Sequence, residues 1–141
     1  MWGALLSVLR KRLMSVAGVA AAASAAAVFA AGPAAAQVFD VNTRASGSYL
    51  AFAGSMNFQS VGEHISTCDN SSDGAGVIGY WKVGSGGTVH PLYAGGGRGT
   101  CERVNASAGE SSYVYLKVCI RNNGNVIEGT CSAWDSFPAG A

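Results

Sequence analysis

The sequence predicts an all-β protein: a small antiparallel β-sandwich, Ig-like or barrel-like, that follows a helical signal peptide. After residue 36 no segment sustains the helical period, whereas several short runs alternate apolar and polar residues. Clusters of Gly, Ser and Asn separate these runs, as turns separate the strands of a sandwich. All four cysteines follow residue 36, and an even number in a small exported domain predicts two disulfides.

Residues 1–36 have the three-part layout of a secretory signal peptide. An Arg-Lys-Arg cluster at 10–12 precedes a mostly apolar, alanine-rich stretch at 13–31. A Gly-Pro pair then ends the helix, and the alanines at 34–36 supply the small residues that a signal peptidase recognises. We expect cleavage before Gln37 and a secreted, extracellular protein. The alternative is a retained membrane anchor, for which the alanine-rich stretch is only weakly apolar.

The mature chain is expected to be a single domain, residues 37–141. Three of the nine Lys and Arg residues lie in the leader and all eight Asp and Glu residues lie after it, so the formal charge of the mature chain is −2. Because no basic patch is present, nucleic acid is excluded as a partner. A domain of this size buries only about two-thirds of its unfolded surface. We therefore expect a monomer with a thin core and no membrane span after cleavage.

The alternating runs define six or seven short strands. Residues 38–46 are weakly patterned and are expected to form an extended lead-in. In Tyr49–Phe58 the apolar residues, Leu50 and Phe52 included, fall at alternate positions and would share one face. The expected strands are, in order, Tyr49–Phe58, Val61–Cys68, Gly76–Val83, Thr88–Tyr93, Cys101–Ser107, Ser111–Asn122 and Val126–Trp134.

Two of these strands carry further information. Ser111–Asn122 has the strongest pattern, because every second residue from Val114 to Ile120 is aliphatic. Thr88–Tyr93 contains Pro91, which cannot donate to a ladder, so we expect this strand at the edge of a sheet.

The last hairpin bears on the disulfide pairing. A two-residue turn at Asn123-Gly124 would place Cys119 opposite Glu128, three residues short of Cys131. That offset is roughly 10 Å, which no disulfide spans. An odd-numbered loop or a bulge at Gly124 would instead place the two cysteines opposite each other, so we expect an irregular turn; the other connectivities remain open. The preferred pairs are Cys119–Cys131 and, by elimination, Cys68–Cys101.

The segment Asp69–Gly74, DNSSDG, partly matches a calcium-binding loop. Three of its residues fall at the first, third and fifth EF-hand positions, but the twelfth, which should be a bidentate glutamate, is Tyr80. The residues that follow are typical of a strand rather than a helix. We interpret the segment as a tight turn capped by its own side chains, with Asp69 and Asp73 as a weak calcium candidate. No metal site or other cofactor is expected.

Four aromatic residues are candidate binding residues. Tyr80 and Trp81 are adjacent in a strand and therefore point to opposite faces. Tyr113 and Tyr115 share the face opposite Val114, and they form an outward stripe if the aliphatic face is the core. Exposed aromatics on a flat sheet suit stacking on sugar rings or contact with a protein. The alternative is that another part of the fold covers them.

No catalytic motif is present, and we expect no enzyme activity. No serine lies in a G-x-S-x-G pattern, and neither His64 nor His90 has a partner at metal-ligand spacing. Four glutamates could form a glycosidase pair only inside a cleft that desolvates them, which a thin core does not favour. These are Glu63, Glu102, Glu110 and Glu128.

Four stretches, "GEHISTCDNSSDGAGVIGYW", "GTCERVN", "YLKVCIRNNGN" and "CSAW", together resemble a group of small exported actinobacterial proteins. The shared features are a Cys-Asp-Asn turn with a following Asp-Gly and a late valine-cysteine strand. The resemblance spans residues 62–134. It implies an exported bacterial β-domain with two disulfides, and it carries over no site residue.

The sequence thus predicts a secreted, non-catalytic module that binds an extracellular or envelope partner, a protein or a glycan, through surface aromatics. The alternative is a secreted inhibitor or toxin-like effector that acts through an exposed loop, Ala94–Thr100.

Overall fold

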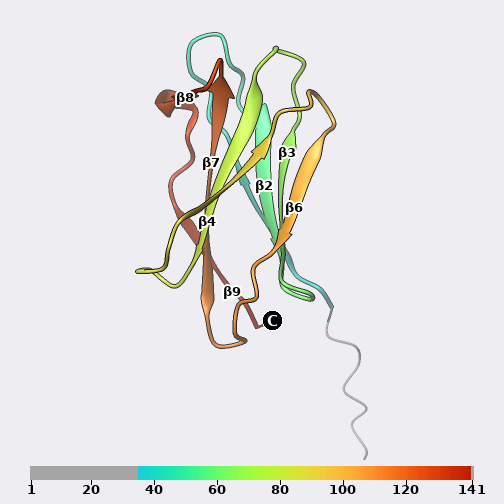
Figure 1. The fold of residues 1–141 in the computed structure, drawn as a ribbon, viewed down its shortest axis with the longest axis vertical. Coiled ribbons are helices and arrows are strands. Elements are labelled where there is room, and N and C mark those ends of the chain that lie inside the picture. The colour runs from blue at the N-terminus through green and yellow to red at the C-terminus, as the bar shows by residue number, and fades with distance from the viewer. Residues whose placement is uncertain (1–34, 141) are drawn as a thin grey trace, which may run out of the picture. The chain divides into compact units, whose positions relative to one another are not determined.

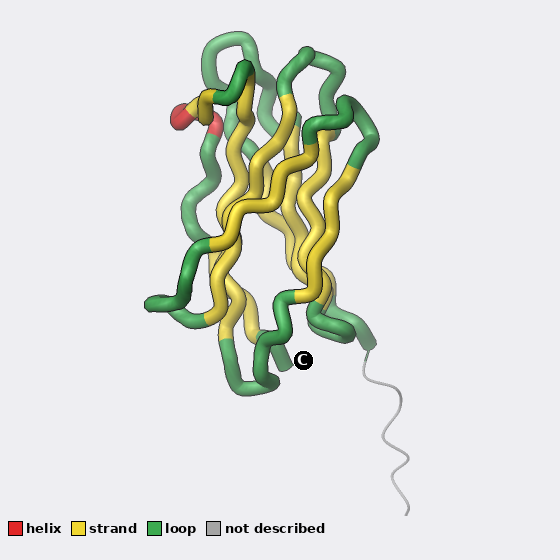
Figure 2. The backbone as a smooth tube through the Cα atoms, viewed as in Figure 1, coloured by secondary structure: helices red, strands yellow, loops and turns green. Residues whose placement is uncertain are grey.

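A computed structural model describes residues 35–140. The predicted signal peptide lies outside these residues, apart from its last two alanines. Two antiparallel sheets face each other, and loops close both ends of the sandwich (Figures 1 and 2). The elements are β1 Val38–Asn42, β2 Gly54–Gln59, β3 His64–Asp69, β4 Gly76–Val83, β5 His90–Ala94, β6 Cys101–Asn105, β7 Tyr113–Asn122, β8 Asn125–Ile127, the 3-10 turn η1 Glu128–Thr130 and β9 Asp135–Pro138.

The sheet topology confirms the predicted all-β sandwich. The first sheet has the order β1-β2-β3-β6. The second has the order β5-β4-β7-β8, and β9 pairs with β7 beside β8. Strand β5, which contains Pro91, lies at the edge of the second sheet, as the proline predicted.

The core lies between the sheets and is built by strict alternation along the strands. On β7 every second side chain from Val114 to Ile120 is aliphatic and at most 1% exposed, which confirms the pattern found in the sequence. Side chains from both sheets interlock with them. The buried members of this core include Val41, Met56, Phe58, Ile65, Val77, Val114, Leu116, Val118 and Ile120.

Two predictions about the N-terminal part of the domain are wrong. Residues 38–42 are a true strand, since β1 pairs with β2 over its whole length. Residues 49–53 are not strand: the chain folds back there, and the amide of Phe52 donates to the carbonyl of Thr43 at 3.0 Å. Phe52 adopts a φ of 62° and is 66% exposed, and Leu50 is 73% exposed. The alternation of apolar residues did not reveal this turn, because Leu50 and Phe52 fall at the same alternate positions as the buried residues of β2.

Both predicted disulfides are present, Cys68–Cys101 and Cys119–Cys131. The first joins residues directly opposite each other on β3 and β6. The irregular turn predicted for the second is wrong. Asn123 and Gly124 form a regular two-residue turn with φ values of 48° and 81°, and Asn122 pairs with Asn125.

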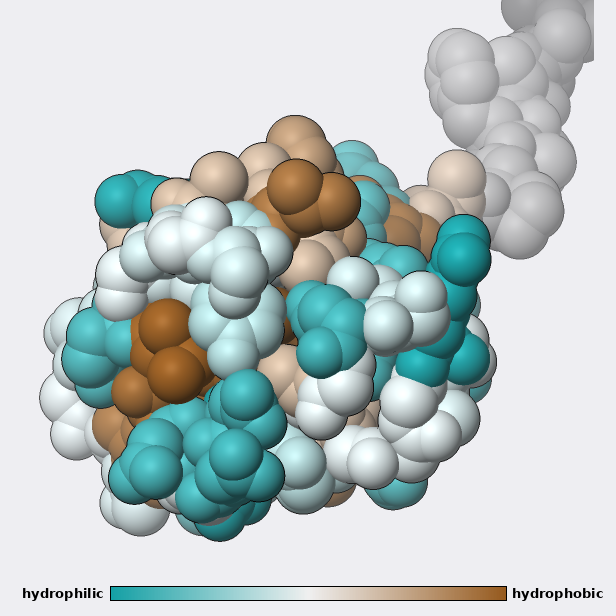
Figure 3. Space-filling view, turned by 90° about the horizontal axis from the view of Figure 1, so that it is seen from above, coloured by the Kyte–Doolittle hydropathy of each residue, from teal (hydrophilic) through white to brown (hydrophobic). Residues whose placement is uncertain are grey.

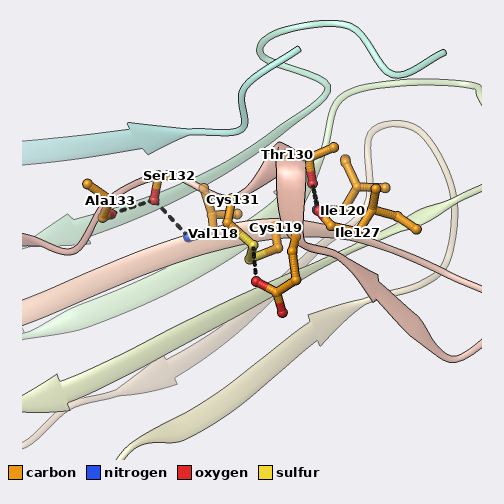
Figure 4. Close-up of a disulfide and its surroundings, with 9 residues drawn as sticks. Val118, Cys119, Ile120, Ile127, Thr130, Cys131, Ser132 and Ala133 are labelled. Carbon is orange, nitrogen blue, oxygen red and sulfur yellow. Dashed lines mark hydrogen bonds between the residues drawn. A yellow bond between two sulfur atoms is a disulfide. The ribbon is translucent and has the colours of Figure 1, made fainter. Parts of the chain in front are cut away.

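The 3-10 turn η1 supplies the offset instead. After Ile127 the chain leaves the β8 ladder, makes one turn over Glu128–Thr130 and brings Cys131 back to β7 (Figure 4). The hydroxyls of Thr130 and Ser132 then accept from the amides of Ile120 and Val118, at 2.9 and 3.1 Å. Between β8 and β9, where no strand pairs with β7, these hydroxyls accept the hydrogen bonds that a neighbouring strand would otherwise accept.

The two disulfides indicate an oxidising, extracellular environment. Among residues 35–140, no helix has the length and apolar character needed to cross a membrane.

Candidate functional site

The outer face of the second sheet carries five of the eleven aromatic residues of the domain, among them four of its five tyrosines. Residues that pair directly across strands point to the same side of a sheet. Cys119 faces outward from β7, and its neighbour in the register is Ile78, which in turn pairs with Tyr93. By the same register, Tyr80 pairs with Lys117, and Lys82 pairs with Tyr115. We call this surface the outer face; its aromatic and basic members are Tyr80, Lys82, Tyr93, Tyr113, Tyr115, Lys117, Arg121 and Trp134.

A lysine organises one end of the outer face. The ammonium group of Lys82 lies 5.2 Å from the ring centroid of Tyr115 and 5.2 Å from that of Trp134. It also donates to the carbonyl of Ser85. A cation near two ring faces is attracted to both, so Lys82 holds the two rings about a common point.

The middle of the face covers a disulfide. Ile78, Cys119 and Cys131 form a small buried cluster outside the main core, and Tyr80 packs against it together with Val126. Tyr80 therefore packs against the disulfide on one side and remains half-exposed to solvent on the other. Tyr113 and Trp134 are more open, at 53% and 39% exposed.

The structure brings three of the four predicted aromatics together and separates the fourth. Tyr80, Tyr113 and Tyr115 lie on the outer face, because Val114 and Leu116 point into the core. Trp81 points to the inner side, where it packs against the core and stacks on His90 at 4.5 Å between ring centroids. Trp81 is consequently not part of the outer face.

Sequence reasoning missed two residues of this face, Tyr93 and Trp134. Tyr93 could have been placed only with the β4–β5 register, which depends on how the glycine-rich segment at 84–87 turns. Trp134 follows η1, where the chain is not a strand and alternation carries no information. The signal available for both was only that each is a large aromatic beside a turn.

The loop Asp69–Gly74 behaves as a capped turn. One carboxylate oxygen of Asp69 accepts from the amide of Ser71 at 3.0 Å, and one of Asp73 accepts from the amide of Ala75 at 2.9 Å. Burial raises the pKa of the Asp69 carboxyl; the amide of Ser71 partly offsets this, and the nearby negative charge of Asp73 adds to it. In the described part of the chain, no group of three or more His, Cys, Asp or Glu residues is placed to hold a metal ion.

The histidines and glutamates are dispersed. His64 begins β3 in the first sheet, and His90 begins β5 in the second. Glu63 and Glu110 line one shallow depression of about 360 Å³ at the end of the sandwich opposite Asn123. Glu110 is exposed and Glu63 half-buried, so the depression does not desolvate either carboxyl group as a general acid requires.

Comparison with known proteins gives no match for this chain, either to a family model, to a curated protein or to a solved structure.

Proposed function

We propose that this protein is a secreted, non-catalytic module of bacterial origin that binds an extracellular polysaccharide on its outer face. The observation that carries the proposal is the grouping of Tyr80, Tyr113, Tyr115 and Trp134 on one side of a single sheet. The leader sequence and the two disulfides support an exported protein.

The chemistry of the face favours a sugar polymer over a protein partner. A tyrosine or tryptophan ring offers an apolar surface and a polar edge, which suits the C–H and hydroxyl groups of a sugar ring. Aliphatic side chains contribute little to the accessible surface of this face, since Ile78 in its middle is 7% exposed. The sheet is also rigid, because β7 is bonded on both sides and stapled by Cys119–Cys131.

The polymer can be acidic or neutral, since the face carries cationic side chains that can pair with acidic groups of a polymer. Lys82, Lys117 and Arg121 lie on it, and the register places the side chain of Asp135, paired with Leu116, on the other side of the sheet. Glu128 stands at the margin, with its carboxylate 3.6 Å from the sulfur of Cys131.

Retention on insoluble polysaccharides tests the proposal. The disulfide-bonded protein is mixed with cellulose, chitin or isolated cell-wall material, and the bound fraction is measured after washing. Replacing both Tyr113 and Trp134 by alanine removes two open rings, each worth roughly 1 kcal/mol in a stacked contact, so we expect roughly thirty-fold weaker retention.

The control variant is Phe52→Ala. Phe52 is as exposed as these rings but lies in the β1–β2 loop, away from the outer face, so its loss should leave retention unchanged. Passage of the protein through every polysaccharide without retention would overturn the proposal, as would equal losses in the double variant and the control.

One observation favours an inhibitor as a second candidate. The loop 95–100 is tied to β3 by bonds from the amide of Gly99 to the carbonyl of Asp69 and from the amide of Asp69 to the carbonyl of Thr100, at 2.7 and 2.9 Å. The disulfide at Cys101 follows directly, so an exposed arginine, Arg98, is presented on an anchored loop. Such a loop resists cleavage, whereas rapid cutting by trypsin after Arg98 with binding intact would contradict an inhibitor that acts through it.

A further inference from the structure

Three loops meet around an open depression at one end of the sandwich. They connect β3 to β4, β5 to β6 and β7 to β8, and all lie at the end drawn uppermost in Figure 1. The depression measures about 650 Å³, which falls in the range of small-molecule sites. Viewed onto this end, neutral and hydrophilic residues cover much of the surface (Figure 3).

The lining of this depression is basic. Arg98 contributes to it from the β5–β6 loop and Arg121 from the end of β7, and the other lining residues are uncharged, mostly glycine, serine and asparagine. Asp73, which lies between the lining residues Ser72 and Gly74 in the sequence, is itself outside the lining, and its carboxylate accepts from the amide of Ala75. Among the described residues that line the depression, none carries a carboxylate that would neutralise the two guanidinium groups.

Arg121 is held in a defined position. Its guanidinium carbon lies 4.7 Å from the ring centroid of Tyr93, and its Nε donates to the carbonyl of Gly124 at 3.3 Å. The ring below and the carbonyl beside it restrict the side chain, while the two terminal nitrogens keep their N–H donors. A guanidinium group held in this way can donate two parallel hydrogen bonds to the oxygens of a carboxylate or phosphate, and it loses little conformational freedom on binding.

Two glycines make room for the supporting ring. A Cβ atom at Gly76 would lie 2.5 Å from the Tyr93 hydroxyl, and one at Gly95 would lie 2.4 Å from a carbon of its ring. A side chain at either position would therefore displace the Tyr93 ring from its place beside the guanidinium. The arrangement of Gly76, Tyr93, Gly95 and Arg121 is thus one packed unit rather than a loose surface arginine.

The glycine-rich loop adds backbone donors. Within the described residues the amides of Gly96, Gly97 and Arg98 have no hydrogen-bond acceptor, and all three residues line the depression. Gly97 and Gly99 have φ values of 89° and 85°, so positive φ alternates with the ordinary conformation of Arg98 between them. Successive amides in such a turn form concavities that accept anions.

We propose that this depression binds an oxyanion, the carboxylate or phosphate of a small polar ligand, between Arg98 and Arg121. Arg121 supplies the fixed guanidinium, Arg98 closes the opposite side, and the amides at 96–98 donate hydrogen bonds to the remaining oxygen. The site shares Tyr93 and Arg121 with the outer face, but Arg98 and the loop amides lie outside that face. The probes below are small molecules rather than polymers, so this site can be tested separately from polysaccharide binding.

Titration with two anionic probes and one neutral probe tests the site. The disulfide-bonded protein, labelled with ¹⁵N, is titrated with sn-glycerol 3-phosphate, with galacturonate and with glycerol. We expect saturable shifts of the amide signals at 95–98 and of the Arg121 Nε–H with the anions only, weakened by added NaCl. The tighter of the two anions identifies the source of the oxyanion, phosphate or carboxylate.

Charge-removing variants localise the site. Arg98→Gln removes an exposed side chain that makes no bond within the fold and should weaken binding roughly ten-fold, the usual effect of one lost charge-assisted bond. Arg121→Gln should do at least as much. The matched control is Arg103→Gln, on β6 of the other sheet, where the guanidinium bonds to Gln59 and should not affect binding.

Three outcomes would overturn the proposal. The first is the absence of saturable shifts with either anion at about 10 mM, a concentration that detects even weak complexes. The second is an equal response to glycerol, which would show that charge is not recognised. The third is binding that Arg98→Gln and Arg121→Gln leave as strong as Arg103→Gln does.

Discussion

Cys119 is bonded to Cys131 across a hairpin whose register would place Cys119 opposite Glu128. The 3-10 turn Glu128–Thr130 removes this three-residue offset by winding the chain back toward β7. Cys131 is then flanked by two hydroxyl side chains that bond to β7. The disulfide is therefore enclosed by backbone and side-chain contacts, with Cys119 0% and Cys131 8% exposed.

We predict that the two disulfides are reduced in a fixed order. Cys101 is exposed and Cys68 half-buried, whereas both sulfurs of the other bridge are enclosed. Because a thiolate must reach the sulfur that it attacks, mild reductant should open Cys68–Cys101 first. Alkylation after increasing times, followed by mass spectrometry of the peptides, measures the order. Earlier labelling of Cys119 and Cys131 would show that the hairpin opens more readily than the structure implies.

The same prediction about the disulfides extends to stability, because loss of the exposed bridge should still be costly. It closes a loop of 33 residues, and the chain-entropy estimate for such a loop is about 3–4 kcal/mol. The double variant Cys68→Ser with Cys101→Ser should lower the free energy of unfolding by about that amount in a urea titration. A change below about 1 kcal/mol would mean that the unfolded chain is already restricted in this region.

The hydroxyl groups beside Cys131 provide a second prediction. The amide of Ile120 is buried and donates to the hydroxyl of Thr130, so Thr130→Val keeps the side-chain shape and leaves the amide without an acceptor. We expect a loss of about 1–3 kcal/mol in the free energy of unfolding. The control is Thr88→Val, an exposed threonine with no side-chain hydrogen bond in the described residues, which should change stability by less than about 0.5 kcal/mol. Equal effects at the two sites would show that Ile120 finds another acceptor.

Sequence patterns located most of the strands because alternation and burial report the same property. β4 was predicted with the bounds it has, and β7 was predicted from the aliphatic parity that forms the centre of the core. The outward direction of Tyr113 and Tyr115 follows from the same parity. Pattern reasoning of this kind works wherever a strand has one buried and one exposed face.

The same reasoning fails where backbone hydrogen bonds, rather than burial, set the conformation. The fold-back at Phe52 depends on a bond to Thr43, and the return of Cys131 depends on a 3-10 turn, neither of which has a periodic signature. The proposed oxyanion site depends on Arg98 and Arg121, which are 23 positions apart and line one depression only because the β5–β6 loop and the end of β7 lie at the same end of the sandwich.

The conformation of Phe52 provides a third prediction. At most positions glycine is less stable than alanine because it loses more freedom on folding. At a φ of 62° the alanine Cβ is strained, so Phe52→Gly should be more stable than Phe52→Ala by roughly 1 kcal/mol. The same pair of substitutions at the neighbouring exposed Leu50, which has no positive φ, should show the ordinary order. Thermal unfolding of the four variants measures both differences, and a less stable glycine at Phe52 would contradict the observed backbone.

A fourth prediction concerns Asp69, whose side chain is 1% exposed and has one carboxylate oxygen without a hydrogen-bond partner in the described residues. Burial raises the pKa of this carboxyl in the folded protein above its ordinary value of 3.8. The folded state therefore binds the proton more tightly than the unfolded state does. The contribution of Asp69 to stability is fully favourable below the unfolded pKa and is lost as the pH rises through the folded pKa.

Asp69→Asn removes this titration while keeping an oxygen that can accept from the amide of Ser71. We expect the variant to gain stability relative to the parent as the pH rises from 4 toward 7, since only the parent comes to bury a charge. Urea titrations at a series of pH values measure the difference. Asp73→Asn is the matched control: Asp73 is exposed, so the decline that Asp69 causes should persist in that variant, slightly reduced because one neighbouring negative charge is gone. A difference between Asp69→Asn and the parent that stays constant with pH would show that the Asp69 carboxylate is ionised at no cost in the folded protein.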